Sequence, residues 1–372
     1  MLKVVADSKI PFLKGALEPV ASVVYMPGSE ISSSHLAHAD ALIVRTRTRC
    51  NESLLAGTRV RFIATATIGF DHIDRSYCQK AGVSWTNAPG CNSGSVQQYI
   101  ASALCHIARR DRRPLASYTI GIVGVGHVGS RVERLARTLG MRVLLNDPPR
   151  EEREGAEPFV SLSTILEQSD IVTLHVPLSL SGQHPTHHLA NDDFFSRVRR
   201  GAWFINASRG EVVKTSALQR AIDTGSVGGT VLDVWENEPE LNLNLLQSVS
   251  IATPHIAGYS LDGKANGTAQ SVQAVSRFFG LGMDNWYPSG IPLPTNPTIT
   301  VQANGDIMNR LILHTYDIST DSNALKANPE LFERLRDGYP PRREFGAYSV
   351  RVSKAIQPFE AVIKGLGFGI FK

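Results

Sequence analysis

Three polar side chains follow predicted strands, and their chemical types suit one reaction. Arg209 comes directly after WFINAS, Glu238 after VLDVWEN and His255 after SIATP. Open α/β sheets bind ligands at the carboxyl ends of their strands. An arginine can hold a carboxylate through two parallel hydrogen bonds, and a histidine can take a hydroxyl proton while a carboxylate stabilises the imidazolium. Together the three residues predict oxidation of a 2-hydroxy acid beside a nicotinamide ring.

Each of these residues has an ordinary alternative explanation when it is taken alone. Arg209 could be a surface arginine, Glu238 a solvated loop residue and His255 a capping residue. The hypothesis depends on their shared placement at strand ends. The hypothesis therefore depends on whether the predicted strands bring these three side chains to one site.

A glycine pattern in TIGIVGVGHVGSRVERLARTLGMRVLLND predicts a dinucleotide site. Gly124, Gly126 and Gly129 follow an apolar strand and open an amphipathic helix. Such glycines permit a tight turn, a close approach of backbone to pyrophosphate, and close packing of helix on strand. Asp147 ends the next strand, eighteen residues beyond Gly129, where an acid can bind the ribose hydroxyls and repel a 2′-phosphate. NAD is favoured over NADP, although Arg150 could act in the opposite sense, and a purely structural glycine turn is the alternative.

Short apolar runs alternate with helical patterns along most of the chain, which is typical of parallel sheets covered by helices. Helices are expected over residues 95–109 and 129–140. Strands are expected over residues 2–6, 22–25, 41–44, 62–64, 118–123, 142–145, 171–174, 203–206, 230–234 and 250–252. After about Gly280 the segment NWYPSGIPLPTNP is typical of a linker. The prediction is an α/β fold with two Rossmann-like or flavodoxin-like parallel-sheet domains and a small C-terminal α+β domain.

The segments INASRGEVV, VLDVWENEP and PHIAGYS resemble the signature sequences of the D-isomer-specific 2-hydroxyacid dehydrogenases. TATIGFDHID and NAPG also match substrate-domain loops of that family. The resemblance implies an NAD-dependent oxidoreductase in which Arg209, Glu238 and His255 are the catalytic residues.

The same resemblance implies the domain organisation. A discontinuous substrate-binding domain would span residues 1–95 and 258–285, around an NAD-binding Rossmann domain over 96–257. One subgroup of the family acts on a small phosphorylated 2-hydroxy acid, and VRTRTRCNESLLAG, APGCNSGSV and HIAGYSLDGKANGT match it. That subgroup carries an extra C-terminal domain, here residues 286–372, which there mediates homodimerisation.

Binding residues are carried over from the family position by position. Substrate contacts would be Thr46, Thr67 and Tyr259. The cofactor would lie at Gly124, Gly126, His127, Val128, Gly129, Asp147, Val176, Ala207, Ser208, Arg209, Asp233 and Gly258. Two positions depart from the pattern: Gln98 stands where related enzymes often have an acid, and His127 where they commonly have asparagine. Neither departure affects the expected chemistry.

The run RTRTRC over residues 45–50 could provide a cationic site for the substrate phosphate. In a strand or its extension, Arg45, Arg47 and Arg49 would lie on one face. A solvated sheet edge is an alternative of nearly equal weight for the three arginines. Arg45 is the stronger substrate-binding candidate, because it directly follows the apolar strand and precedes Thr46.

Three other candidates with reactive side chains are set aside. His184, His187 and His188 invite a zinc interpretation, but no Cys or acid nearby in the sequence completes a tetrahedral set, so a polar loop is favoured. The segment GFDHID could mimic a metal or acid–base cluster, but the family resemblance makes it a turn. Cys91 has no sequence neighbour to serve as its base and is expected to be a non-catalytic thiol. No metal is expected.

Composition places the chain among ordinary globular proteins. Its 372 residues are 42% hydrophobic and 19% charged, and the net charge of +4 is a poor argument for nucleic acid but suits a small anionic ligand. The four cysteines form no CxxC pair, which favours reduced thiols in a cytoplasm. We expect a cytoplasmic protein with no signal peptide and no membrane partner, since no apolar run approaches the roughly 18 residues of a membrane span.

Three functional hypotheses follow. The first is an NAD-dependent dehydrogenase for a small phosphorylated 2-hydroxy acid. The second is another D-2-hydroxyacid dehydrogenase, such as one acting on 3-phosphoglycerate, and the third is an NAD(H)-sensing, corepressor-like binding protein. The intact set of Arg209, Glu238 and His255 favours an enzyme. The arginine that binds the substrate phosphate stays open, because Arg342 and Arg343 in YPPRREF are a second source of charge if the C-terminal domain reaches the site.

Overall fold

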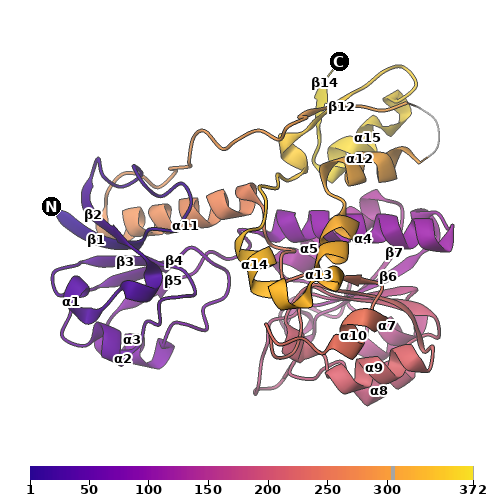
Figure 1. Cartoon of the computed structure of the whole chain (residues 1–372), viewed down its shortest axis with the longest axis horizontal. Helices are drawn as coiled ribbons and strands as arrows, with labels where there is room; N and C mark the ends of the chain where they lie inside the picture. Colours follow the sequence, from indigo (N-terminus) through magenta and orange to yellow (C-terminus); the bar gives the residue numbers. More distant parts are fainter. Residues whose placement is uncertain (303–305, 372) are drawn as a thin grey trace. The chain divides into compact units, whose positions relative to one another are not determined.

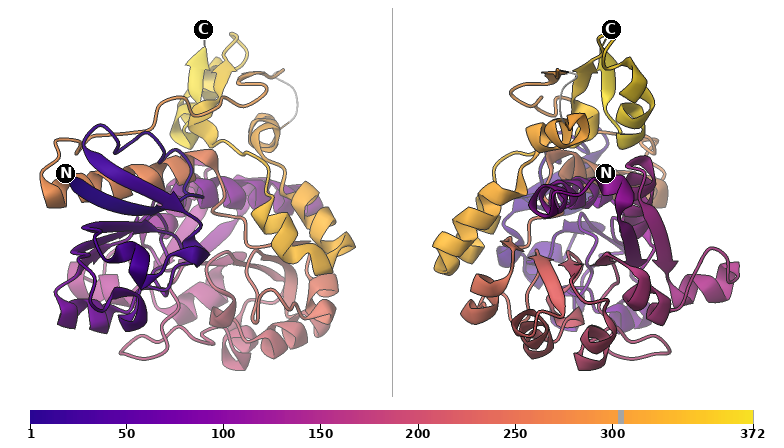
Figure 2. Two further views of the ribbon diagram at one scale, coloured as in Figure 1. Left: turned by 60° about the vertical axis from the view of Figure 1, so that its left-hand side comes forward. Right: turned by 90° about the vertical axis from the view of Figure 1, so that its right-hand side faces the viewer.

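The computed structural model describes residues 1–302 and 306–371. The chain divides into two compact units (Figures 1 and 2). The first unit consists of Met1–Asn92 and Ser260–Pro292, and the second of Ser93–Tyr259 and Leu293–Lys372.

The first unit is built on a five-stranded parallel sheet in the order β2-β1-β3-β4-β5. This is a flavodoxin-like strand order. The strands are β1 (Leu2–Asp7), β2 (Ala21–Met26), β3 (Ala41–Val44), β4 (Phe62–Thr65) and β5 (Ser84–Thr86). The helices are the 3-10 turn η1 (Gly28–Glu30), α1 (Ser33–Leu36), α2 (Glu52–Leu55), α3 (Arg75–Ala81) and α11 (Leu261–Phe279).

Side chains of the first sheet alternate between two apolar cores, as the two-residue repeat of a strand requires. Val5 and Leu42 face one core, while Val4 and Ile43 face the other. The helix α11 contributes Val272 to the second core. Burial on both faces explains why these strands are almost continuously apolar.

The second unit contains a six-stranded parallel sheet in the order β11-β10-β9-β8-β6-β7. The strands are β6 (Thr119–Val123), β7 (Arg142–Asn146), β8 (Ile171–Leu174), β9 (Ala202–Asn206), β10 (Val227–Leu232) and β11 (Ile251–Ala252). A single bridge from Leu145 to Phe159 extends the sheet beyond β7. The order reverses between β6 and β8, and such a switch point is where open α/β sheets bind ligands.

Helices cover both faces of the second sheet (Figure 1). One face packs against α4 (Ser93–Asp111) and α5 (His127–Thr138). The other packs against α7 (Leu162–Gln168), α8 (Asp192–Arg197), α9 (Thr215–Asp223) and α10 (Leu243–Ser248). The remaining elements here are α6 (Pro148–Glu154) and the 3-10 turns η2 (Leu115–Ser117) and η3 (Gly210–Val212).

The C-terminal part of this unit forms a small three-stranded parallel sheet with helices around it. Its strands are β12 (Thr298–Thr300), β13 (Ser349–Arg351) and β14 (Gly369–Phe371), in that order. Its helices are α12 (Ile307–Thr315), α13 (Ile318–Ala327), α14 (Phe332–Asp337) and α15 (Glu360–Leu366), with 3-10 turns η4 (Pro329–Leu331), η5 (Phe345–Ala347) and η6 (Gln357–Phe359).

This C-terminal part packs on the helices α4 and α5 that cover the larger sheet, and on its edge strand β11 (Figure 2). Leu311 and Ile312 of α12 lie in the same core as Leu104 of α4. Ser322 of α13 accepts a hydrogen bond from the main-chain N–H of Ala252 at 3.0 Å, so α13 covers the edge strand β11. Truncation after the linker would therefore expose apolar core.

The predicted fold class is confirmed: two parallel-sheet α/β regions and a small third sheet near the C-terminus. Some boundaries differ for local reasons. The helix predicted from residue 129 begins at His127, because Gly126 is its N-cap. The strand predicted over residues 230–234 is Val227–Leu232, after which Asp233 turns its side chain to the following loop.

The expectation for the RTRTRC run was wrong in one respect. β3 ends at Val44, and residues 46–47 form a turn closed by a hydrogen bond from Thr48 N–H to the Arg45 carbonyl at 3.3 Å. Arg45, Arg47 and Arg49 therefore do not line one face of a strand. Arg45 alone keeps its predicted place directly after β3.

Within the described residues, no helix has the length and apolar character that crossing a bilayer requires.

Candidate active site

The glycine-rich turn between β6 and α5 has the geometry that its sequence predicted. Gly124 has φ +86, and a methyl group there would meet the His175 carbonyl oxygen at 2.7 Å and the Val176 side chain at 2.8 Å. At Gly129 a methyl group would overlap the Gly124 carbonyl. At Gly126 it would meet nothing within 4 Å, so the approach to the helix start is open.

The start of α5 can accept an anion. No side chain caps the helix at Gly126, and the first N–H groups of a helix have no intrahelical partner. His127 is exposed there and Val128 is half-buried. The open backbone at Gly126 and the helix dipole together fit the pyrophosphate of a dinucleotide.

Asp147 lies directly after β7, beside this turn. One carboxylate oxygen accepts the Val125 N–H at 2.7 Å, and the other accepts the Arg150 N–H at 3.0 Å at the start of α6. The guanidinium of Arg150 donates to the Val125 carbonyl at 2.7 Å and to Glu154 at 2.6 Å. Arg150 is thus held by Glu154, whose side-chain hydrogen bond is the main cause that raises the pKa of Arg150 above its usual value.

The loop after β9 is shaped by a buried asparagine that the sequence pattern did not single out. Asn206 is fully buried; its amide donates to the Arg209 carbonyl at 2.9 Å, and its oxygen accepts the Ser208 N–H at 3.0 Å. Ala207 and Arg209 remain half-buried. Arg209 donates to the Ser208 carbonyl at 2.7 Å. A methyl group at Gly210 would overlap the Trp235 carbonyl, so this loop closely approaches the loop after β10.

Glu238 and His255 form a direct pair. Glu238 Oε2 accepts a hydrogen bond from His255 Nδ1 at 2.7 Å, and its Oε1 accepts the Trp235 N–H at 2.9 Å. A carboxylate partner requires Nδ1 to carry the proton, which leaves Nε2 as the neutral ring's acceptor. Nε2 of His255 makes no hydrogen bond with any residue that the structure describes. His255 has φ 57, an uncommon conformation for a residue other than glycine.

The three predicted catalytic residues come from adjacent strands. β9, β10 and β11 are neighbours in the sheet and run parallel, and Arg209, Glu238 and His255 follow them in turn. The structure therefore places all three at the same edge of one sheet.

The main chain after His255 is held from both sides. Asp233, which is 1% exposed, accepts the N–H groups of Ile256 at 2.8 Å and Ala257 at 2.9 Å. From the other side, Arg342 donates to the Ile256 carbonyl at 3.3 Å and the Ala257 carbonyl at 2.7 Å. Asp233 and Arg342 thus fix the segment that carries the histidine.

Arg342 is therefore held inside the protein through Nη2, while its buried Nε and Nη1 have no hydrogen-bond partner among the described residues. It is 6% exposed, donates to Ser95 Oγ at 2.5 Å, and its guanidinium lies 4.2 Å from the centre of the Tyr316 ring. The carboxylate of Asp321 accepts hydrogen bonds from Tyr316 at 2.7 Å and Tyr339 at 2.9 Å. Burial raises the pKa of Asp321 despite these bonds.

Tyr259 and Gly258 complete this segment and remain half-buried. The Tyr259 hydroxyl accepts a hydrogen bond from Nε of Arg336 at 3.1 Å, and its ring packs edge-on against Tyr339. Arg336, on α14, was not identified from the sequence.

The substrate-contact candidates of the first unit lie at the carboxyl ends of β3 and β4. Arg45 Nε donates to the buried carboxylate of Asp7 at 3.0 Å, and its side chain is 32% exposed. Thr46 is exposed in the turn that follows β3. Thr67 is half-buried; its hydroxyl bonds to Thr65 Oγ1 at 2.8 Å and donates to the Gly69 carbonyl at 2.9 Å.

The side chains set aside in the sequence have local partners. His184 Nε2 bonds to Glu152 at 2.8 Å and His188 Nε2 to Glu236 at 2.6 Å. His72 is buried and bonds to Thr65 at 3.0 Å, while Cys91 is buried. No group of three or more His, Cys, Asp or Glu side chains in the described ranges is arranged to hold a metal ion.

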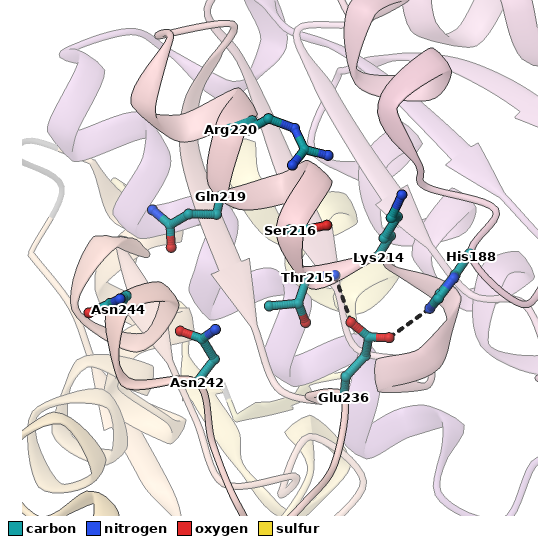
Figure 3. A pocket seen from close by; sticks show the side chains of 9 residues that line it. All are labelled: His188, Lys214, Thr215, Ser216, Gln219, Arg220, Glu236, Asn242 and Asn244. Carbon is teal, nitrogen blue, oxygen red and sulfur yellow. Dashed lines mark hydrogen bonds and ion pairs between the residues drawn. The ribbon is translucent and has the colours of Figure 1, made fainter.

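A separate pocket of about 470 Å³ lies at the start of α9 (Figure 3). It is lined by His188, Lys214, Thr215, Ser216, Gln219, Arg220, Glu236, Asn242 and Asn244. None of the predicted catalytic residues lines it.

Comparison with known proteins gives a consistent result. Residues 97–257 match the model described as D-isomer specific 2-hydroxyacid dehydrogenase, NAD binding domain, and residues 291–364 match a domain of unknown function. The D-lactate dehydrogenase of Aquifex aeolicus, solved in complex with NAD and lactic acid, is 30% identical with a TM-score of 0.61. That match covers 77% of this chain and 99% of the other.

Two curated relatives match almost the whole chain. The erythronate-4-phosphate dehydrogenase of Bacteroides fragilis is 52% identical over 95% of this chain and 100% of its own length. The protein of the same name from Porphyromonas gingivalis is 44% identical over 94% of this chain and 95% of its own.

The fold and the matching domain define a D-isomer-specific 2-hydroxyacid dehydrogenase, which is a class of NAD-dependent oxidoreductases. The resemblance seen in the sequence is thereby confirmed. Within that class, the chain belongs to the erythronate-4-phosphate dehydrogenase family.

Proposed function

We propose that this protein oxidises 4-phospho-D-erythronate to (R)-3-hydroxy-2-oxo-4-phosphooxybutanoate, in the synthesis of pyridoxine 5′-phosphate. The names of the full-length relatives support this substrate. The observation that carries the chemistry is the 2.7 Å pair of Glu238 and His255, one strand away from the loop of Arg209.

Each catalytic residue has a distinct task in this proposal. Arg209 binds the substrate carboxylate with its guanidinium. His255 takes the proton of the 2-hydroxyl at Nε2, because Nδ1 is engaged by Glu238. Glu238 orients the ring and stabilises the imidazolium that forms.

The cofactor would be held by the second unit. Gly124, Gly126 and Gly129 with His127 and Val128 form the pyrophosphate turn, and Asp147 faces the adenosine ribose. Val176, Ala207, Ser208, Asp233 and Gly258 are the other proposed cofactor positions, of which the buried Asp233 acts through the loop that it holds. Bound NAD supplies the hydride acceptor.

The remaining roles follow the family. Residues 1–95 and 258–285 would bind substrate, with Arg45, Thr46, Thr67 and Tyr259 as contacts, and 96–257 would bind NAD. Residues 286–372 would mediate homodimerisation, and the protein would act in the cytoplasm.

One assay separates the three hypotheses. Purified full-length protein with NAD is given 4-phospho-D-erythronate, 3-phosphoglycerate or unphosphorylated D-erythronate, and NADH absorbance is followed. We expect the highest kcat/KM with 4-phospho-D-erythronate. A preference for 3-phosphoglycerate would support a different dehydrogenase, and NADH binding without turnover of any substrate would support a sensor.

The dimer proposal needs a test on the full chain, because truncation would expose the core shared by α4 and α12. Phe359 and Phe371 are 38% and 49% exposed on the C-terminal part. Light scattering should give a dimer for the wild type and a monomer for the F359D/F371D variant. Leu180, 75% exposed elsewhere in the second unit, provides the control L180D, which should stay dimeric.

A further inference from the structure

The C-terminal part places a cation beside Tyr259. Arg336 lies on α14, and α14 is fixed to the second unit by Phe332, which is 1% exposed and packs in the core that contains Trp235 and Leu246. The main-chain N–H of Trp235 itself donates to Glu238. The helix that carries Arg336 is therefore packed against the same core as the loop that presents the catalytic carboxylate.

The contacts of Arg336 use only part of its guanidinium. Nε donates to the Tyr259 hydroxyl at 3.1 Å, and the guanidinium carbon lies 6.0 Å from the centre of that ring. Among the described residues, no carboxylate comes within 4.0 Å of Arg336 to form an ion pair. The side chain is nevertheless half-buried. Burying a cation without an acidic partner destabilises the folded chain, because the guanidinium loses part of its hydration.

The charge of Arg336 is coupled to the active site. Burial works to lower the pKa of Arg336, but Tyr259, Glu238 and Asp233 together raise it above its usual value. Arg336 is therefore a permanent positive charge within electrostatic reach of Glu238.

The other candidate arginines are differently engaged. Arg342 is buried and donates to main-chain carbonyls, and Arg45 is paired with the carboxylate of Asp7. Arg209 is needed for the substrate carboxylate under the proposed function. A phosphorylated hydroxy acid carries a second anionic group, which requires its own cation.

We propose that Arg336 binds the phosphate group of the substrate, with Tyr259 orienting the guanidinium through Nε. This inference rests on the proposed function. It assigns substrate selection to the C-terminal part of the chain, in addition to any role in dimerisation. The terminal nitrogens of Arg336 would donate in parallel to phosphate oxygens, which is the geometry that favours arginine over lysine.

The experiment compares full-length wild type with R336M, R336K and the control R334M. Arg334 is exposed on the same helix, so R334M removes one charge from α14 without touching the site. We expect R336M to raise KM for 4-phospho-D-erythronate about ten- to a hundredfold and to leave KM for unphosphorylated D-erythronate unchanged. R336K should recover part of the loss, and R334M should behave as wild type. Inorganic phosphate should inhibit wild type competitively and R336M much more weakly.

Three outcomes would overturn the assignment. Equal losses of R336M on both substrates would make Arg336 a support for Tyr259 or the fold. Unchanged kinetics of R336M would leave the phosphate to another residue. If R45A, measured in parallel, showed the selective loss while R336M did not, the phosphate site would lie at Arg45. Failure of wild type to turn over 4-phospho-D-erythronate at all would instead reject the proposed function.

Discussion

Two glutamate–histidine pairs of the second unit use glutamates only two residues apart, and they are built alike. In one pair, Glu238 accepts hydrogen bonds from His255 at 2.7 Å and from the main-chain N–H of Trp235 at 2.9 Å. Each carboxylate oxygen thus has its own donor. The pair stands at the carboxyl end of the sheet, next to the loop that carries Arg209.

The second pair repeats this arrangement inside the pocket at the start of α9 (Figure 3). Glu236 accepts hydrogen bonds from His188 at 2.6 Å and from the main-chain N–H of Thr215 at 2.7 Å. Burial alone would raise the pKa of Glu236, but the hydrogen bonds from Thr215 and His188 outweigh it and leave this pKa below its usual value. Glu236 therefore acts as a cap on α9.

The difference lies in which ring nitrogen is used and in what holds the histidine. His255 is bound through Nδ1, which leaves Nε2 to take a proton, and the chain after it is held by Asp233 and Arg342. His188 is bound through Nε2, and its ring stacks on His187. Under the proposed function only the Glu238–His255 pair is catalytic, so a carboxylate–imidazole contact alone would not confer activity. Its position at the carboxyl end of the sheet and the ring nitrogen that keeps no partner among the described residues would make the difference.

The largest expected effect comes from removing the two histidines in turn. H255Q should lower kcat by roughly a hundred- to ten-thousandfold, because the proton acceptor is lost. NADH binding, followed by fluorescence titration, should survive in this variant. H188Q should change kcat by less than about threefold, because His188 is not the proposed proton acceptor. Comparable losses in both variants would break the distinction between the pairs.

Removing the carboxylates should give a smaller effect on rate and a diagnostic effect on pH dependence. E238Q should lower kcat roughly ten- to a hundredfold and move the acid limb of the pH–rate profile to lower pH, because the imidazolium loses its anionic partner. E236Q should leave the profile in place. A pH–rate profile of E238Q that coincides with wild type would show that Glu238 and His255 do not act as a pair.

Removing the hydrogen bonds that Arg342 makes to the main chain after His255 should lower kcat less than removing Glu238 or His255. R342M removes the donor to the Ile256 and Ala257 carbonyls, so kcat should fall about tenfold. The free energy of unfolding should fall by about 1–3 kcal/mol. R342K keeps a cationic donor and should recover part of both losses. The checks are kcat and urea denaturation. A loss of stability with unchanged kcat would limit Arg342 to anchoring the C-terminal part.

The sequence predicted the regular part of this molecule well, for a physical reason. Strands buried on both faces are continuous apolar runs, and the glycine turn has local steric requirements that only glycine meets at Gly124 and Gly129. The sequence also predicted that Arg209, Glu238 and His255 would follow strands, and the structure adds that these strands are neighbours in one sheet. The positive φ of His255 has no signature in the sequence.

Contacts between segments far apart in the sequence could not be predicted from the sequence. Arg342 meets Ala257 across 85 residues and Arg336 meets Tyr259 across 77, and neither pairing leaves a periodic pattern. The arginine run after β3 misled for the opposite reason: its alternation suits a strand, but the chain turns immediately after Val44. The tertiary packing of the C-terminal part determines which partners Arg336 and Arg342 contact.

The smallest expected effect concerns stability and follows from the lowered pKa of Glu236. A carboxyl group whose folded pKa lies below its unfolded value of 4.5 stabilises the fold above that value and loses this contribution as pH falls through the folded pKa. The stability difference between wild type and E236Q should therefore be present at about pH 7 and shrink below about pH 4.5. Because the pair is partly solvated, we expect less than about 1 kcal/mol. Urea denaturation of both proteins at several pH values measures it. A difference that grows on acidification would reverse the sign and show that Glu236 is better accommodated protonated, so that it does not cap α9 as a carboxylate.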